Sequence, residues 1–296
     1  MPATYAHIMI VKSLAHSSIL DSKNFPESAI TAILDNIAFA ELGAISPDYP
    51  YLGGGKLWAD NMHYRETGEI IKNGISRLKA VKDDTLFTWL LGYAAHVITD
   101  ITIHPIVEKK VGDYDSHPKE HRICEMNQDV YIHQQIMGCA LQNSEVLKNL
   151  LSYCSEGDRL NTKISCFWAT ILKDTYPGDY HRNQPEIDKW HNGFRFAVAK
   201  IASTNCCPIR ETAEKAGLVY SKKPDMTYID SLATPLNTVI NYDTAFERAR
   251  ENVIDKWLEI AQAVYANDMD YLASIKNWNL DTGKITGTTQ SEYWEA

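Results

Sequence analysis

The sequence lacks the features that mark membrane-spanning and secreted chains. No apolar run approaches the roughly 18–20 residues that a membrane-spanning helix needs, so we expect no such span. The first residues, MPATYAHIMIVKSLAHSS, have neither a basic leader nor a clear apolar core, so we predict no secretory signal. We therefore expect a cytoplasmic location, or export by a route that needs no cleavable signal peptide.

Cysteine pairs and an excess of basic charge are also missing. The six cysteines form no CxxC motif and fit reduced core thiols better than a disulfide framework or a zinc knuckle. They are Cys124, Cys139, Cys154, Cys166, Cys206 and Cys207. The formal net charge of −9 argues against duplex nucleic acid as a partner, although it leaves a neutral or zwitterionic substrate open. The composition predicts no particular oligomeric state.

Strand patterns are nearly absent, and apolar residues recur instead at helical spacing. The pattern predicts helices over 4–20, 27–42, 66–80, 84–104, 119–142, 144–154, 162–174, 186–203, 208–217 and 242–272. We expect Gly43–Lys56, which holds two prolines and three consecutive glycines, to be non-helical, and Pro105 to end the central helix. The sequence thus predicts one all-α domain over residues 1–275, a multi-helix bundle with a metal cluster between its helices. Residues 276–296 form a polar tail that we expect to be loosely attached.

The stretch WLLGYAAHVITDITIHP, residues 89–105, carries the clearest chemical pattern. His96, Asp100 and His104 recur every four residues in an otherwise apolar run, which places them within an arc of about 80° on one helix face. Their attachment points span about 12 Å along the axis, which suits two metal ions with the aspartate between them. The alternative is two core histidines with ordinary partners and a capping aspartate.

Further metal-ligand residues lie in the same half of the chain. Eight of the ten histidines fall within the first 133 residues. His121 and Glu125 are one turn apart on the next predicted helix, and Asp48 lies in a loop that Pro47 and Pro50 stiffen. Histidine nitrogen and carboxylate oxygen are the ligands that zinc prefers.

Several segments together resemble the zinc-dependent phospholipase C family. They are AHIMIVKSLA, GAISPDYPYL, the His63–Tyr64 pair, LLGYAAHVITDITIHP and HRICE, in the family's order, over roughly residues 1–135. The resemblance implies an all-helical bundle that binds three zinc ions and hydrolyses phospholipids on the diacylglycerol side of the phosphate. The partner it implies is a phospholipid, with transient contact to a membrane surface.

The resemblance also implies a ligand set. One zinc would be bound by Asp48, His63 and His96, a second by His104, His121 and Glu125, and a third by His7, with Asp100 bridging. Asp48 is in addition the candidate general base. Secreted family members complete the third site with an N-terminal tryptophan, whereas Met1 and Pro2 precede His7 here, so we expect two or three zinc ions. The Asp100–His104 spacing is also shorter than in those members, and no C-terminal lipid-binding β-sandwich is visible.

Aromatic residues near Asp48 are the candidates for contact with substrate. Tyr49, Tyr51 and Trp58 are an aromatic wall for a quaternary ammonium head group in one interpretation and ordinary packing in the other. We list Tyr49 and Tyr64 as candidate substrate-binding residues.

Two other functions compete with a phospholipase C. Single-strand nucleases of related architecture use a similar zinc cluster, so the ligands alone do not choose the phosphoester. A helical interaction domain that keeps a structural metal without catalysis is the second alternative.

Overall fold

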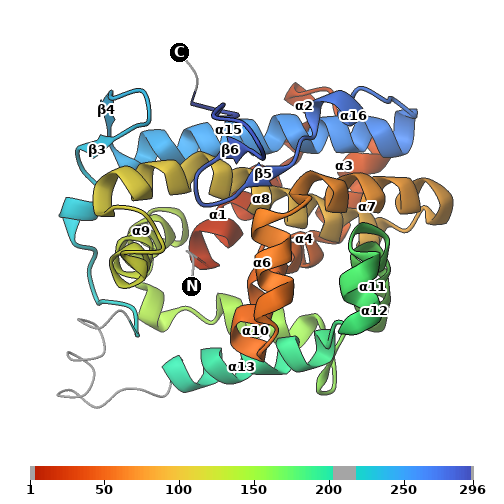
Figure 1. The fold of residues 1–296 in the computed structure, drawn as a ribbon, viewed down its shortest axis with the longest axis horizontal. Helices are drawn as coiled ribbons and strands as arrows, with labels where there is room; N and C mark the ends of the chain where they lie inside the picture. Colours follow the sequence, from red (N-terminus) through yellow and green to blue (C-terminus); the bar gives the residue numbers. More distant parts are fainter. Residues whose placement is uncertain (1–3, 203–217, 295–296) are drawn as a thin grey trace.

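The computed structural model describes residues 4–202 and 218–294 as an assembly of helices with three small hairpins (Figure 1). The helices of the first half are α1 (Thr4–Leu14), α2 (Ser17–Ser22), α3 (Glu27–Asp35), α4 (Ile37–Gly43), the 3₁₀ turn η1 (Ser46–Asp48), α5 (Tyr49–Gly53), α6 (Lys56–Tyr64), α7 (Thr67–Val81), α8 (Asp84–Val111) and α9 (Pro118–Met137). They are followed by η2 (Leu141–Asn143), α10 (Val146–Tyr153), α11 (Thr162–Thr175), α12 (Pro177–Arg182), α13 (Ile187–Ala202), η3 (Met226–Tyr228), α15 (Tyr242–Ala261), the π-helical turn η4 (Gln262–Ala266) and α16 (Tyr271–Ser274). The predicted all-α fold is confirmed.

The strands in the described residues form three antiparallel pairs of two residues each. They are β1 (Ser155–Glu156) with β2 (Arg159–Leu160), β3 (Leu232–Ala233) with β4 (Val239–Ile240), and β5 (Trp278–Asn279) with β6 (Lys284–Ile285). The predicted helix over 208–217, residue 203, Cys206 and Cys207 lie outside the described residues.

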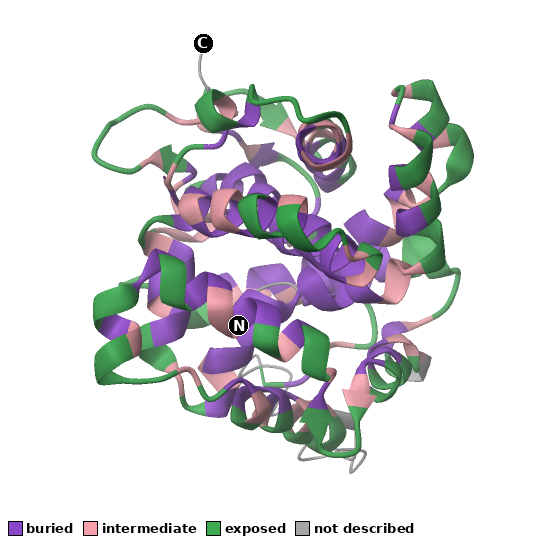
Figure 2. Ribbon diagram, turned by 90° about the vertical axis from the view of Figure 1, so that its right-hand side faces the viewer, coloured by how far each residue is buried: buried purple, intermediate pink, exposed green. Residues whose placement is uncertain are grey.

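Helix α8 is the central element of the core. Every residue from Leu86 to Val107 is buried, and α4, α7, α9 and α15 pack around it (Figures 1 and 2). Its first turn is closed by Asp83, whose side chain accepts a hydrogen bond from the Leu86 backbone N–H at 3.1 Å. By length and composition α8 could cross a membrane, contrary to our expectation that no stretch would, but its apolar window is fully buried inside the molecule.

Two predicted helices are each broken into two shorter ones. The helix over 27–42 is α3 and α4, which meet at Asn36, and the Asn36 side chain donates to the Ala32 carbonyl at 3.0 Å. The same carbonyl also accepts the Asn36 backbone N–H at 3.2 Å, so the asparagine side chain shares the last helical acceptor of α3. The helix over 4–20 is likewise α1 and α2, separated at Ala15 and His16.

At two other places the prediction that prolines end or exclude a helix was wrong. The stretch 43–56 is largely helical, because Pro47 and Pro50 sit at the first turns of η1 and α5, where a missing N–H costs nothing. Pro105 does not end the central helix, which runs on to Val111 and is buried on both sides of the proline, from Leu86 to Val107. Helix α6 was not predicted, and the long helix over 242–272 ends at Ala261 before η4 and α16.

The C-terminal segment, residues 276–294, is packed against the bundle and not loosely attached. Trp278 and Leu280 are 0% exposed and Trp294 is 5% exposed. Thr67 at the start of α7 holds the segment by two bonds, its hydroxyl donating to the Trp278 carbonyl and accepting from the Trp278 N–H. The expectation of a loose tail was wrong because alternating apolar residues in this short polar stretch are directed into the core.

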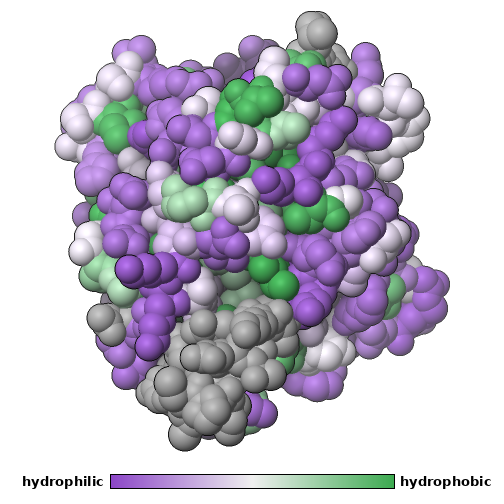
Figure 3. Space-filling view, turned by 90° about the vertical axis from the view of Figure 1, so that its left-hand side faces the viewer, coloured by the Kyte–Doolittle hydropathy of each residue, from purple (hydrophilic) through white to green (hydrophobic). Residues whose placement is uncertain are grey.

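The surface is polar over the face that includes α9 and the β3–β4 hairpin. In Figure 3 hydrophilic side chains dominate this face outside the grey atoms, and the apolar ones are separated from each other. Large exposed apolar residues in this part of the chain include Met226 and Val239.

Candidate metal centre

Four helices and one short turn bring all eight predicted metal ligands together. His7 comes from α1, Asp48 from the end of η1, and His63 from the end of α6. The remaining five lie on α8 (His96, Asp100, His104) and on α9 (His121, Glu125). All eight side chains are buried, with His104 the most exposed at 8%. We call these eight residues the metal-ligand cluster.

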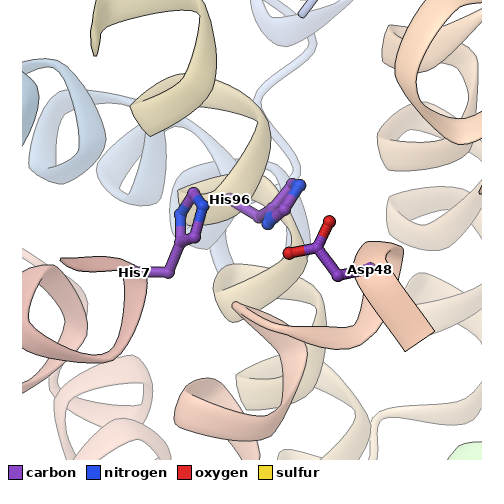
Figure 4. Close-up of side chains that lie close together, drawn as sticks. All are labelled: His7, Asp48 and His96. Atoms are coloured by element: carbon purple, nitrogen blue, oxygen red, sulfur yellow. The ribbon is translucent and has the colours of Figure 1, made fainter. Parts of the chain in front are cut away.

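One side of the cluster joins α6, η1 and α8. His63 Nε2 lies 3.4 Å from Asp48 Oδ1 and 3.4 Å from His96 Nε2. Ligand atoms of His7, Asp48 and His96 also lie within 4.8 Å of one another. Figure 4 shows these three side chains converging from separate elements. Three donors around one point are the arrangement that a zinc ion requires.

Asp100 is the hub of the cluster. Its Oδ1 lies 3.2 Å from His7 Nε2 and 3.3 Å from His104 Nε2, while its Oδ2 lies 3.1 Å from His96 Nε2. One carboxylate thus faces three imidazoles, and its two oxygens are directed to different neighbours. This geometry suits a ligand shared between ions.

The other side of the cluster joins α8 and α9. Glu125 Oε1 lies 3.7 Å from His104 Nε2 and 3.9 Å from His121 Nδ1. The one-turn spacing of His121 and Glu125 therefore places both on the face of α9 that meets α8.

Three histidines are oriented by backbone carbonyls on their far side. The pairs are His63 Nδ1 with Ala59 at 2.8 Å, His96 Nδ1 with Ala44 at 3.0 Å, and His121 Nε2 with Gly112 at 2.5 Å. Each N–H that donates outward leaves the other ring nitrogen with its lone pair directed into the cluster. Such outer partners fix the tautomer and direction of a metal-binding imidazole.

The charges in the cluster depend on one another. Burial alone would raise the pKa of Asp100, but His104, His96 and His7 hold it well below its usual value. Burial would lower the pKa of His104, yet Asp100 and then Asp281 hold it at about 10. Glu125 has fewer cationic neighbours, and burial raises its pKa to about 7.

The residues fit a metal ion because their buried polar atoms have too few partners. Five of these atoms make no hydrogen bond within the described residues: both carboxylate oxygens of Asp48, both ring nitrogens of His7, and Oδ2 of Asp100. Three buried carboxylates in one place are costly unless cations balance them. Histidine and carboxylate together form the donor set that zinc prefers.

Comparison with known families agrees with this chemistry. Residues 6–178 match the family model described as zinc dependent phospholipase C. The chain belongs to this family. No curated protein and no solved structure matches it. Membership in the zinc-dependent phospholipase C family implies a hydrolase that uses zinc and a phospholipid substrate.

The aromatic candidates have different positions relative to this family site. Tyr49 is 0% exposed and its ring stacks on Phe194 at 4.6 Å, which corrects its assignment as a substrate-binding residue, because it is enclosed in the core. Trp58 is 1% exposed and packs on Trp190, so it also has a packing role. Tyr51 and Tyr64 are half-buried beside His63 and line the edge of the cluster.

One residue at the site was not predicted from the sequence. Asp281, in the C-terminal segment, has Oδ1 3.7 Å from His104 Nδ1, and its Oδ2 accepts a hydrogen bond from the Tyr64 hydroxyl at 2.9 Å. The alternation of Trp278 and Leu280 in NWNLD was the only local signal that this stretch is buried. Nothing in the spacing connects it with α8.

The histidines outside the cluster have other partners. The ring nitrogens of His133 face the Cys139 carbonyl and the Ser144 hydroxyl. It therefore holds the turn after α9. His117 is exposed beside Asp113 in the loop between α8 and α9.

Proposed function

We propose that this chain is a phospholipase C, which hydrolyses phospholipids to diacylglycerol and a phosphorylated head group with two or three zinc ions. The observation that supports this most is the single buried cluster of five histidines and three carboxylates where α1, α6, α8 and α9 meet. When bound, zinc supplies positive charge for a phosphodiester and lowers the pKa of a water molecule.

The residues of the cluster have different proposed roles in holding zinc and in transferring a proton. Asp100 bridges the two sides, with His96 and His7 on one and His104 on the other. Asp48 is the proposed general base. Burial opposes its ionised form, but His96 and then His63 lower its pKa, so it is unprotonated near neutral pH and able to accept a proton.

The reaction follows from these roles. A water oxygen forms a bond to phosphorus while the bond from phosphorus to the glycerol oxygen breaks. One proton of the water passes to Asp48, and the leaving glycerol oxygen takes up that proton from Asp48, by way of solvent, to form diacylglycerol. The half-buried Tyr64 at the edge of the cluster is the proposed contact for the substrate.

The net charge favours a lipid over a nucleic acid as the phosphodiester. With 38 acidic and 29 basic side chains, the protein carries a formal charge of −9. A protein that holds single strands generally has a basic groove that follows their backbone.

The experiment compares two substrates on one metal-defined protein. Zinc content is measured by elemental analysis, and hydrolysis is then assayed on phosphatidylcholine micelles and on single-stranded DNA. We expect phosphocholine and diacylglycerol as products, loss of activity with chelator, and recovery when zinc is restored. Cleavage of DNA alone would assign a nuclease, whereas bound zinc without any hydrolysis would indicate a structural metal.

A further inference from the structure

The C-terminal segment contacts two of the helices that carry metal ligands. The Leu280 N–H donates to the carbonyl of His63, on α6, at 3.0 Å. The Trp294 indole N–H donates to the carbonyl of Thr102, on α8, at 2.8 Å. The segment therefore connects α6 to α8 beside the cluster, and it lies outside the family match over 6–178.

Gly283 lets the segment approach α8 closely. It has φ +65°, and an added Cβ would lie 2.5 Å from the Ile101 carbonyl oxygen and 2.7 Å from Pro105. Only glycine combines that conformation with so close a contact. Ile101 and Pro105 flank His104 on α8, so the segment passes directly beside this ligand.

Asp281 is the side chain that the segment presents there. Its Oδ1 lies 3.7 Å from His104 Nδ1, while Tyr64 holds its Oδ2 by a hydrogen bond of 2.9 Å. The Asp281 side chain is 23% exposed, so the pair is largely shielded from water. Its carboxylate is thereby fixed from one side and faces an imidazole on the other.

His104 differs from the other oriented histidines in the partner of its outward ring nitrogen. Its Nε2 faces Asp100 and Glu125 inside the cluster, and its Nδ1 faces outward. The outward nitrogens of His63, His96 and His121 meet neutral backbone carbonyls. Among the described residues, His104 alone of the cluster histidines has a carboxylate from outside the cluster as its outward partner.

We propose that Asp281 is a positioning residue of the zinc centre, whose carboxylate faces His104 Nδ1 as an electrostatic partner and keeps Nε2 directed at the metal. A carboxylate in this place fixes the tautomer and increases the basicity of the imidazole more than a carbonyl does. The inference rests on the zinc centre of the family and does not depend on which phosphoester is hydrolysed.

The test measures zinc binding to the full chain. Metal-free protein is titrated with zinc chloride against a chromophoric chelator, for wild type and for Asp281→Asn, Asp281→Ala and Asp281→Glu. We expect one zinc to bind about 10–100-fold more weakly in Asp281→Ala, less weakly in Asp281→Asn, and close to wild type in Asp281→Glu. Glu292→Gln is the matched control, because Glu292 is an acid of the same segment that bonds Trp278 and lies away from the ligands. It should bind zinc as wild type does.

A spectroscopic measurement separates positioning from general support of the fold. In the cobalt-substituted protein, the exchangeable His104 Nδ1 proton gives a paramagnetically shifted NMR signal. We expect this signal to broaden by solvent exchange in Asp281→Ala and to persist in Glu292→Gln and Asp281→Glu.

The outcomes distinguish this inference from the proposed function. Zinc affinity of folded Asp281→Ala within twofold of wild type, or an unchanged His104 signal, overturns the inference. If that variant does not fold, Asp281→Asn against Asp281→Glu decides on the same criterion. Failure of the wild type to bind any zinc overturns the inference together with the zinc centre, whereas zinc binding without lipid hydrolysis overturns only the proposed function.

Discussion

Buried histidines occur in two regions of this molecule, and their neighbours differ. Those of the metal-ligand cluster face carboxylates and one another. His133 on α9 and His191 on α13 lie elsewhere, and each has a serine hydroxyl 2.8 Å from its Nε2, from Ser144 and Ser155 respectively. Burial does not separate the two groups, since His96 in the cluster and His133 and His191 outside it are each 0% exposed.

The comparison shows that burial does not by itself mark a metal site. Burial lowers the pKa of His133, and burial followed by Arg195 lowers the pKa of His191 to about 4. In the cluster, Asp100 outweighs the same burial and holds the pKa of His104 at about 10. Neutral partners keep a buried histidine uncharged and structural, whereas a surplus of carboxylates creates a place for a cation.

The largest effect should follow the loss of the hub of the cluster. Asp100→Ala removes the carboxylate that faces three histidines, so we expect zinc affinity to fall more than about a hundredfold and hydrolysis to be lost with it. Asp255→Ala on α15 removes an exposed aspartate paired with Lys23 and should change neither. An Asp100→Ala protein with full zinc and full rate would make the cluster irrelevant to function.

A smaller effect should appear in the pH dependence of folding. His191 titrates at about 4 in the folded chain and near 6.5 when unfolded, so the folded state binds fewer protons between these values. Its contribution to stability is therefore present above pH 6.5 and is lost as the pH falls through about 4. Urea unfolding of metal-free wild type should lose about 2 kcal/mol more between pH 7 and pH 4 than His191→Gln loses. Parallel curves for the two proteins would contradict this.

In the metal-ligand cluster, zinc affinity should depend on pH. Metal-free protein carries a proton on His104 at neutral pH, because its pKa is about 10, and zinc must displace that proton. We expect zinc affinity to weaken about tenfold for each unit that the pH falls between 8 and 6. Chelator competition at several pH values measures this slope, and a flat profile would show that His104 is not a ligand.

The smallest effect should come from removing the neutral hydroxyl that contacts His133. Ser144→Ala removes the hydroxyl that meets His133 Nε2, which should lower the free energy of unfolding by about 1 kcal/mol. Zinc affinity should stay as in wild type, because His133 is outside the cluster. A drop in zinc affinity would instead connect the two regions.

Most of the cluster could be predicted from the sequence because its residues recur at short helical spacing. His96, Asp100 and His104 follow helical spacing on α8, and His121 with Glu125 do so on α9. The structure brings these residues together with His7, Asp48 and His63, although their roles as zinc ligands remain a prediction. The all-α class was equally accessible, since apolar residues recur at helical spacing along most of the chain.

Tertiary context decided what the sequence could not predict. Pro105 lies within α8 because the surrounding core holds the helix through the missing hydrogen bond. Tyr49 lies next to Asp48 in the chain but faces Phe194, and no local pattern reveals that direction. Asp281 reaches His104 only through the path of a segment whose contacts lie far away in the sequence.

The bond between Leu280 and His63 has a consequence for the order of assembly. The ribosome synthesises residues 276–294 long after it has made all eight ligands of the cluster. Until this segment emerges, α6 and α8 lack the bonds that Leu280 and Trp294 make to them, and His104 lacks its outward partner. We therefore expect the nascent chain to hold zinc weakly, so that a hydrolase built this way becomes competent only after its synthesis has passed Asp281.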